Sequence, residues 1–461
     1  MHVKKEEKLM ATASKLNGKR ETLSDEAIVS LCRSKEVQFI QLQFVDVHGK
    51  PKQMTVHSDL LERALNNEIM LDGSSIAGFR SIETSDMYFY PDKATFQILP
   101  WLQGGRRSAR LICDIYNPDG TPFEGCPRNN LKRVIKKAAS LGYTYNVGPE
   151  LEFFLLKRNP DGSLTTQDSA GYYDLAPDDL GDEVRCKIVD TLESMGFAIE
   201  ASHHEVANGQ HEIDFEYSDA LSTADNVIDF KIVTRKIASE YGLHATFMPK
   251  PFFGINGSGM HANQSLSDIN GSNLFLDEKA EYQLSETCLN YIGGTLKHIR
   301  GFAAVTNPLI NSYKRLVPGY EAPVYIAWSP SNRSALIRIP AKRGRSTRME
   351  LRSPDPSCNP YLAFAVMLTA GLDGVQKKIK PPSPTTVNIY HLNEIEREEQ
   401  SIPSLPGSLY EALEEYKKSE ISKEALGEHI YAEFLKAKTR EWDEYKTYVS
   451  SWETQRYINT Y

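Results

Sequence analysis

The stretch Glu205-Val-Ala-Asn-Gly-Gln-His-Glu212 decides how the middle of this chain folds. Asn-Gly is the strongest short-range signal for a β-hairpin, because a two-residue loop of this kind needs positive φ at both of its positions. With Asn208-Gly209 as that loop, Glu205 faces Glu212 across the two strands. Like charges directly opposite each other are destabilising. Either both carboxylates point to water, or a cation or a proton lies between them.

Further candidate ligands stand in other strand-like runs. Glu150 and Glu152 lie two residues apart in an aromatic and aliphatic run, a spacing that puts both on one strand face. His261 and Glu350 lie in two more such runs, so we expect all the Glu ligands to stand on strands. Five Glu and one His make an oxygen-rich set, which suits Mg²⁺ or Mn²⁺ rather than zinc. Six ligands are enough for two ions with open positions for substrate.

Composition excludes several classes of protein. The chain has 461 residues, 40% hydrophobic and 25% charged, which is ordinary for a soluble protein with room for two or more domains. A net charge of −8 gives no reason to expect nucleic acid. The six cysteines are scattered without a C-x-x-C pair, which favours a reducing cytosol. No secretory signal is visible, and the longest apolar run, 361–372, is too short to cross a membrane.

Turn signals near residue 120 divide the chain. We expect a mobile N-terminal tail (1–20), a small α+β domain (21–121) and a larger domain (122–461). In the small domain, Ser24 is a candidate N-cap for a helix over 24–34. In the larger domain, helices and strands alternate. There we expect helices over 127–141, 182–195, 222–241 and 278–300, strands over 144–157 and around His261, and a hairpin over 197–217.

A basic segment follows. Residues 333–352 carry the seven cations Arg333, Arg338, Lys342, Arg343, Arg345, Arg348 and Arg352. Charge runs are usually solvated faces, but apolar neighbours surround Arg338 and Arg352. Arg348 and Arg352 flank the candidate ligand Glu350 on one strand face, an arrangement that suits a polyphosphate. The Gly-rich run 254–259 could bring backbone close to a ligand, although it lacks the Walker pattern.

A long apolar and aromatic loop, 307–323, carries Arg315 and Glu321. Such loops inside a compact domain are usually functional or disordered, and the composition speaks against disorder. We interpret it as a lid that closes over substrate; a plain surface connection is the alternative.

Several motifs now match a known family in the right order. They are Phe44-Val-Asp-Val-His-Gly-Lys-Pro-Lys52, Leu71-Asp-Gly-Ser-Ser75, Gly148-Pro-Glu-Leu-Glu-Phe-Phe154, the hairpin 205–212, and the segments 250–263, 307–323 and 348–360. From about residue 38 to Tyr461 the chain resembles a type I glutamine synthetase. The resemblance implies an α+β fold: a small N-terminal β-grasp domain, and a larger catalytic domain on a curved, mainly antiparallel sheet with flanking helices. It also implies a cytoplasmic dodecamer of two hexameric rings, with active sites between subunits.

The implied activity joins ammonium to the γ-carboxylate of L-glutamate, giving L-glutamine, ADP and phosphate from ATP through γ-glutamyl phosphate. By the same similarity, Glu152, Glu205 and Glu212 would hold one Mg²⁺ or Mn²⁺ ion, and Glu150, His261 and Glu350 the other. Glutamate would bind Asn256, Gly257, Arg315 and Arg352; ATP would bind Tyr217, Asn263, Ser265, Arg333, Arg338 and Arg348. Ammonium would meet Tyr172, Glu205, Glu321 and a neighbouring subunit's Asp46, and the implied catalytic residues are Asp46, Glu321 and Arg333.

Two features bear on regulation. The spacing from Glu152 to Glu205 is short, so the chain lacks the insertion of the subclass regulated by adenylylation, and we expect Tyr390 to be unmodified. In the short subclass, an arginine after the Gly-Phe of the Asp-Gly-Ser-Ser segment is linked to feedback inhibition by glutamine. Here Arg80 lies one place early and Ser81 takes the expected position, which leaves feedback open.

Two other functions compete with the implied one. A γ-glutamyl-amine ligase of the same superfamily would join glutamate to a larger amine, and such relatives tend to lose the ammonium-site residues that are present here. A regulatory protein that binds a transcription factor is the second alternative, against which the intact ligand set argues.

Overall fold

The computed structural model describes residues 22–387, 389 and 402–461. The predicted tail 1–20 and Tyr390 therefore lie outside the described residues. Within the described ranges, no helix combines the length and the apolar character that crossing a bilayer requires.

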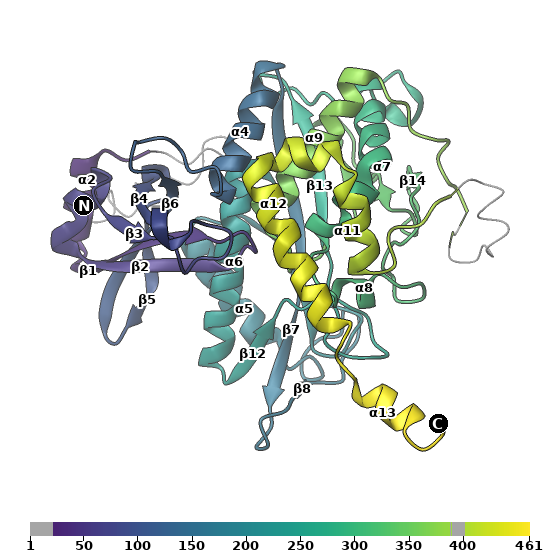
Figure 1. Ribbon diagram of the computed structural model, residues 1–461, viewed down its shortest axis with the longest axis horizontal. Coiled ribbons are helices and arrows are strands. Elements are labelled where there is room, and N and C mark those ends of the chain that lie inside the picture. The colour runs from purple at the N-terminus through teal and green to yellow at the C-terminus, as the bar shows by residue number, and fades with distance from the viewer. Residues whose placement is uncertain (1–21, 388, 390–401) are drawn as a thin grey trace.

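The N-terminal part folds around a six-stranded sheet of order β2-β1-β6-β4-β3, with β5 paired to β6 (Figure 1). Its elements are α2 (Asp25–Ser34), β1 (Val37–Val45), β2 (Pro51–His57), α3 (Leu61–Leu65), β3 (Met70–Asp72), β4 (Asp86–Pro91), β5 (Gln97–Gln103) and β6 (Arg106–Tyr116). β1 and β6 run parallel and the other pairs are antiparallel. The Ser24 hydroxyl accepts from the Ala27 amide, as predicted for the N-cap of the first helix.

The larger part is built on a ten-stranded sheet of order β14-β15-β16-β13-β7-β10-β9, with β8, β11 and β12 also paired to β7. Its strands are β7 (Thr144–Arg158), β8 (Leu164–Thr166), β9 (Ile199–His204), β10 (Gln210–Phe215), β11 (Ser218–Asp219), β12 (Leu243–Thr246), β13 (Met260–Ser267), β14 (Trp328–Ser329), β15 (Ile337–Arg338) and β16 (Met349–Leu351). Only the β14–β15 pair is parallel among these strands. The expected α+β class, with a mainly antiparallel sheet, is confirmed.

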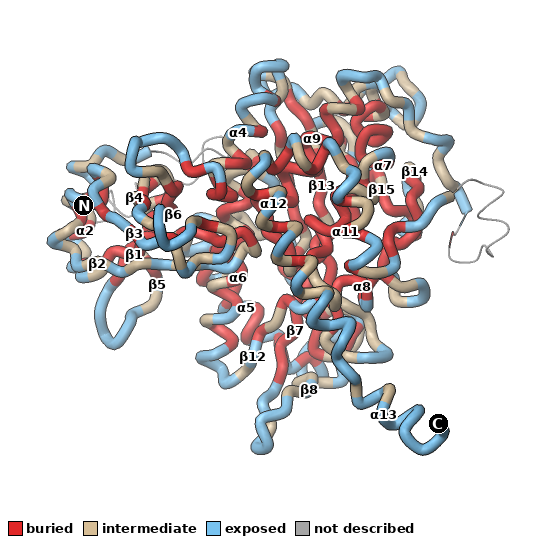
Figure 2. Tube along the Cα trace, in the orientation of Figure 1, coloured by how far each residue is buried: buried red, intermediate tan, exposed pale blue. Residues whose placement is uncertain are grey.

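Helices flank this sheet. They are α4 (Pro127–Ser140), α5 (Asp182–Ser194), α6 (Ala220–Glu240), α7 (Glu286–Thr306), α8 (Ser312–Arg315), α9 (Pro360–Lys377), α11 (Leu409–Lys417), α12 (Glu420–Tyr445) and α13 (Ser451–Tyr457). α9 is buried on all sides along most of its length, so the run 361–372 forms a core helix, as its composition predicted (Figure 2). α13 carries the C-terminal end away from the body (Figure 1).

Buried ionic groups join the two parts. Arg128, at the start of α4, contacts Asp92 and Asp114 of the small part and Asp225 of α6 at 2.8–3.0 Å. Arg110 of β6 pairs with Asp229 of α6. Since a buried charge is tolerated only when it is paired, this network fixes how the small sheet sits on the larger part.

The structure corrects the predicted hairpin. The turn has four residues, 206–209, and Glu205 pairs through its backbone with Gln210, so His203 rather than Glu205 lies opposite Glu212. Of Asn208 and Gly209, only Gly209 has a positive φ, whereas the expected two-residue loop needs both. Glu205 therefore lies just after β9, at the entry to this turn, and the expectation that every Glu ligand stands on a strand is wrong at this position.

The helix predicted over 278–300 begins and ends later in the structure. The chain forms a turn there, with positive φ at Tyr282 and Gln283, and α7 begins after its N-cap Ser285. It then continues to Thr306, beyond the predicted end.

Candidate active site

The acidic side chains lie on one face of the larger sheet because of strand register. His261 pairs with Glu150 across β13 and β7, and Glu212 pairs with Glu152 across β10 and β7. Paired residues share a face, and a spacing of two keeps the next residue on it. The intervening residues point the other way and form the core: Leu151, Phe153, Ile213, Met260 and Ala262 are essentially inaccessible to solvent.

The first group comprises Glu150, His261 and Glu350, whose ligand atoms lie within 4.8 Å of one another. His261 Nδ1 is 3.1 Å from Glu150 Oε2 and 3.7 Å from Glu350 Oε1. Asn263 donates to Glu150 Oε1 at 2.9 Å. Burial alone would raise the pKa of Glu150, but His261, Asn263 and Arg338 lower it to about 2. Glu150 is therefore an anion at neutral pH.

The second group comprises His203, Glu205 and Glu212, also within 4.8 Å. His203 Nε2 lies 3.1 Å from Glu205 Oε1. Glu152 stands between the two groups: its Oε2 accepts from Gln210 and from the Gly259 amide, and its Oε1 is 3.8 Å from His261 Nε2. The structure thus brings the six sequence-predicted ligands together.

Crowding of carboxylates marks this place as electrostatically unfavourable without a cation. Burial raises the pKa of Glu212 well above its usual value, and Asp214, Glu152, Glu150 and Glu205 add to the shift. Burial, and to a lesser extent the charge of Glu150, raises the pKa of Asp214 to about 7. A bound divalent cation would relieve this repulsion, so the donor set fits such an ion.

Arginines border the acidic groups on the β15–β16 side. Arg338 Nε lies 2.9 Å from Glu350 Oε2, and Arg352 Nε lies 3.2 Å from Glu350 Oε1. Arg348 donates to Asn263 Oδ1 at 2.9 Å. Positive charge therefore lines one edge of the carboxylate face, as predicted.

The residues predicted for nucleoside are near this edge. Tyr217 is half-exposed and packs against Gly148. A Cβ added to Gly148 would lie 3.0 Å from the Tyr217 side chain. Ser265 lies on β13 two residues beyond Asn263, on the same face.

Glycines allow close approach next to the carboxylates. A Cβ on Gly259 would lie 2.5 Å from Arg315 Nη2 and 3.1 Å from His261 Nε2, and one on Gly257 would lie 2.2 Å from the Pro249 carbonyl. Arg315 Nη1 donates to the Ser353 carbonyl at 2.7 Å. Glycine at these two positions therefore lets Arg315 and the Pro249 carbonyl pack directly against the backbone of the Gly-rich run.

The predicted lid contacts this Gly-rich run. Asn256 donates to Glu321 Oε2 at 2.9 Å, and the Lys250 ammonium lies 3.7 Å from the centre of the Tyr320 ring. Glu321 itself has φ 58°, a left-handed conformation that is uncommon for glutamate and that clusters at functional sites. These contacts hold Glu321 and Tyr320 against the segment 250–256.

Tyr172 and Arg333 lie at the Glu205 side of the site. The Tyr172 ring packs edge-on against His203, with ring centres 5.6 Å apart. Burial first, then the Tyr173 hydroxyl and the Glu205 charge, raise the pKa of Tyr172 to about 12, while Arg333 lowers it. Both predicted residues are therefore near Glu205.

Asp46 is differently placed. Its Oδ1 accepts from the His48 and Lys50 amides, and its Oδ2 lies 3.6 Å from the Lys52 ammonium. Asn359, the N-cap of α9, donates to the Asp46 carbonyl. These contacts are within its own turn and with α9, rather than with the acidic groups of the same chain.

Sequence reasoning missed His203 and Asp214. Both follow from alternation, because His203 is two residues before Glu205 and Asp214 is two residues after Glu212. The wrong hairpin register hid His203, since it placed Glu205 where His203 stands.

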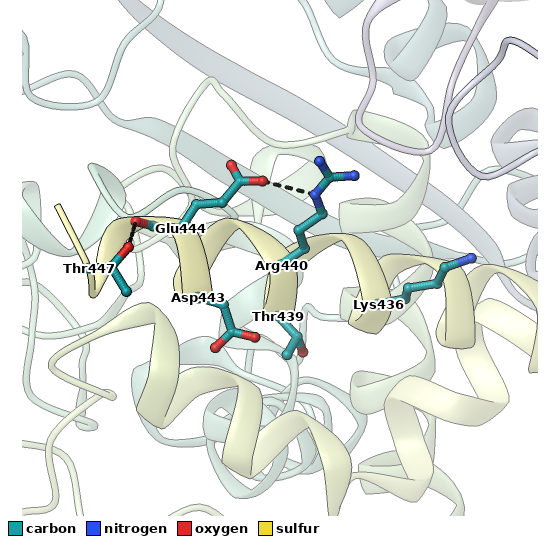
Figure 3. Close-up of a pocket in the computed structure, with 6 residues that line it drawn as sticks. All are labelled: Lys436, Thr439, Arg440, Asp443, Glu444 and Thr447. Atoms are coloured by element: carbon teal, nitrogen blue, oxygen red, sulfur yellow. Dashed lines mark hydrogen bonds and ion pairs between the residues drawn. The ribbon is translucent and has the colours of Figure 1, made fainter.

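A surface hollow elsewhere has no comparable chemistry. It runs along one face of α12 (Figure 3) and is lined by Lys436, Thr439, Arg440, Asp443, Glu444 and Thr447. Five of the six lining residues lie on α12, and Thr447 follows two residues after its end. On the helix, Arg440 and Glu444 form an ordinary i,i+4 pair at 2.8 Å. We interpret it as a groove between solvated side chains.

Comparisons with known proteins agree with the fold. The model of the glutamine synthetase β-grasp domain matches residues 36–118, and that of the glutamine synthetase catalytic domain matches residues 124–457. A glutamine synthetase of Clostridium saccharobutylicum is 56% identical over 438 residues, covering 95% of this chain and 99% of that protein. One of Methanosarcina mazei is 56% identical over 436 residues, covering 94% and 97%. A solved GmaS/ADP complex superposes with a TM-score of 0.86 at 32% identity, covering 94% and 99%.

The fold, the acidic face and these matches define an ATP-dependent, metal-binding ligase of glutamine biosynthesis. The chain belongs to the glutamine synthetase family, which confirms the resemblance found in its sequence motifs.

Proposed function

We propose that this chain joins ammonium to the γ-carboxylate of L-glutamate through γ-glutamyl phosphate, using the carboxylate face and its arginine border. The observation that supports this most directly is the row of paired acidic residues on one sheet face, with Arg338 and Arg352 at its edge. A carboxylate resists attack by ammonia because it is already an anion. Phosphorylation converts it to an acyl phosphate with a good leaving group.

In this proposal two Mg²⁺ or Mn²⁺ ions are held by two sets of residues, Glu150, His261 and Glu350, and Glu152, Glu205 and Glu212. Clustering of these oxygens and the raised pKa of Glu212 support it. The bound ions supply positive charge near the phosphates during transfer. His203 is added to the second set because its ring nitrogen lies within the same 4.8 Å group.

The arginines orient the two anionic substrates. Arg333, Arg338 and Arg348 bind ATP phosphates, with Asn263, Ser265 and Tyr217 at the nucleoside. Arg315 and Arg352 bind glutamate carboxylates, while Asn256 and Gly257 receive the amino end. The similarity to a GmaS/ADP complex supports binding of an adenine nucleotide by this fold. Guanidinium forks suit both groups because they bind carboxylate and phosphate in a bidentate way.

Ammonium needs a site that binds a cation and removes a proton. Glu205 and Glu321 supply negative charge, Tyr172 supplies an aromatic wall and a hydroxyl, and Asp46 of a neighbouring subunit completes the site. The closed lid excludes water, which would otherwise hydrolyse the acyl phosphate.

One assay tests the reaction. The purified chain is incubated with glutamate, ammonium and ATP, with and without added Mg²⁺ or Mn²⁺, and glutamine is measured. We expect glutamine only when a divalent metal is present. Running the same assay with a panel of primary amines discriminates the γ-glutamyl-amine ligase; preference for a larger amine over ammonium would contradict the proposal. Absence of any ligation would favour a regulatory protein instead.

A shared site implies assembly, for which we propose a dodecamer of two hexameric rings in the cytoplasm. The free thiols of all six cysteines support a reducing compartment. Asp46→Asn and Glu212→Gln, each inactive alone, should regain activity when the two proteins are dissociated and reassembled together, because some sites then receive both intact residues. A mixture that stays inactive would contradict a site shared between subunits.

Arg80, one place before the position linked to feedback in the short subclass, contacts residues at the domain junction, where it lies 2.9 Å from Glu124 and over the Phe123 ring.

A further inference from the structure

Beneath the turn that carries Glu205 lies a second charged cluster, which the proposed chemistry does not use. It consists of Asp168, Asp179, Arg185 and His204, called here the buried brace. Their side chains are 0–6% exposed. Burying a charged side chain costs free energy of folding even when it is paired. Four such side chains beneath the site therefore indicate a specific role for them.

Asp168 joins both ends of the turn. Its Oδ1 accepts from the Gly209 amide at 2.8 Å and lies 3.3 Å from His204 Nε2. The other ring nitrogen, His204 Nδ1, is 2.6 Å from the Glu205 carbonyl. One carboxylate therefore fixes the end of the turn directly and its beginning through an imidazole.

The segment that contributes Asp168 also carries Tyr172. The Tyr173 amide donates to the His204 carbonyl at 3.1 Å, and Asn208 donates to the Ala170 carbonyl at 3.0 Å. The segment 168–173 is thus bonded to the turn along its length. Moving the turn would move Tyr172 relative to Glu205.

Arg185 of α5 closes the cluster from the other side. Its Nη1 lies 2.7 Å from Asp179 Oδ2 and 2.9 Å from His211 Nδ1. Asp168, Asp179, His204 and His211 also satisfy the spacing of a metal site. The Arg185 guanidinium already lies between Asp179 and His211, however. The positive charge in this cluster is therefore a side chain of the protein rather than a bound ion.

We propose that Asp168 and His204 are positioning residues, which hold Glu205 and Tyr172 at the distance that an ammonium ion requires between them. This inference rests on the proposed function of that site. The brace touches no substrate; it acts by fixing Glu205 and the turn 206–209 against the segment 168–173. Residues that orient a ligand from behind typically alter affinity or activity 10- to 100-fold when changed.

Asp168→Asn is the first test. It keeps an oxygen for the Gly209 amide and removes the charge that faces His204. With saturating divalent metal, we expect the ammonium KM to rise roughly tenfold, while the KM for ATP stays within about twofold. Asn208→Ala, which cuts only the link to Ala170, should shift the ammonium KM in the same direction by less.

Asp373→Asn is the matched control. Asp373 forms the same kind of pair with His298, at 2.8 Å between α9 and α7, away from the turn. It should leave the ammonium KM unchanged. If Asp168→Asn leaves the ammonium KM unchanged, or raises all three substrate KM values in parallel, the positioning role is overturned.

Mn²⁺ binding gives a readout that does not need activity. Because Glu205 is a proposed ligand, Asp168→Asn should weaken one Mn²⁺ site in an electron paramagnetic resonance titration. If the unaltered chain makes no glutamine and the variant still weakens Mn²⁺ binding, the proposed function fails and the brace stands. A third tight ion per chain that disappears in Asp168→Asn would instead make the cluster a metal site and overturn the brace.

Discussion

Glu321 is the side chain on which the proposed lid depends. It is held over the Gly-rich run by Asn256, in a strained backbone conformation. Glu321→Ala should leave glutamate-dependent ATP turnover partly intact while glutamine formation falls at least about tenfold, because the acyl phosphate still forms but loses a proton acceptor and its cover. ADP and glutamine are measured in the same reaction. Equal loss of both products would contradict a lid role.

Lys231 of α6 offers a pH test far from substrate. Burial lowers the pKa of Lys231 to about 8. Arg235 lowers this pKa further, whereas Cys358 and Asp355 raise it. Below pH 8 both folded and unfolded chains carry the proton, and the folded chain bears the full cost of burying the charge. Stability should therefore rise between about pH 8 and pH 10.5 as the folded chain sheds it.

Lys231→Met should consequently be more stable than the natural chain at pH 7, by up to about 3 kcal/mol for a shift of this size. Its advantage should shrink by pH 10. Urea unfolding midpoints at the two pH values measure this. An advantage that is equal at both pH values would show that the ammonium charge is not the cause.

At this scale, strand patterns predicted part of the site. The spacing of two on an apolar strand gave Glu150 and Glu152, the predicted hairpin gave Glu212, and the structure places all three on one face. The hairpin register could not be obtained from Asn208-Gly209 alone, because the four-residue turn is selected by Asp168 and Ala170, some forty residues earlier in the chain. The hydrogen bonds from Asn208 and Gly209 to the segment 168–170 therefore outweigh the preference of Asn-Gly for a two-residue loop.

Among the elements, the pair α7 and α9 depends on glycine. A Cβ on Gly294 would lie 2.3 Å from the Ala370 carbonyl, and one on Gly371 would lie 2.1 Å from the Tyr291 ring. Gly294→Ala should destabilise the protein by roughly 1–3 kcal/mol, because two packed backbones must separate. Gly407→Ala is the control, since its Cβ would find only Glu411 oxygens at 3.7 and 3.8 Å. Urea midpoints that match for the two variants would refute this close packing.

Element boundaries were harder to predict than element type. The segment 278–284 has the composition of a helix, yet Ser285 provides the N-cap for α7 and the preceding residues turn. By contrast, Ser24 and the helix after it agree with prediction, because the cap bond is local. The run 361–372 was recognised as a core helix since its apolar character extends all around.

For the whole molecule, the network around Arg128 should govern how firmly the small part is attached. Arg128→Met removes the guanidinium from buried Asp225, while Lys132 still pairs with Asp114, and the loss should cost roughly 3–5 kcal/mol. Arg440→Met breaks the exposed pair with Glu444 and should change stability by less than about 1 kcal/mol. Urea unfolding followed by tryptophan fluorescence compares them. Similar losses in both variants would mean that the junction is not held by charge.

At this scale the sequence predicted a small α+β unit and a larger unit, and the structure has two sheets on either side of residue 120. The ionic network between them had no sequence signal, because Arg128 and Asp225 are 97 residues apart. Nor could composition tell which strands would be neighbours in the larger sheet. The motif resemblance supplied the β-grasp domain and a mainly antiparallel sheet, and the order of the strands comes from the structure.

The central claim is that acidic side chains from separate strands hold two divalent cations. A Mn²⁺ titration of the metal-free protein, followed by electron paramagnetic resonance, tests it most directly. The unaltered chain should bind two ions tightly. Glu350→Gln and Glu212→Gln should each retain one, because they belong to different groups. Absence of tight binding in the unaltered chain, or two tight ions in both variants, would contradict the claim.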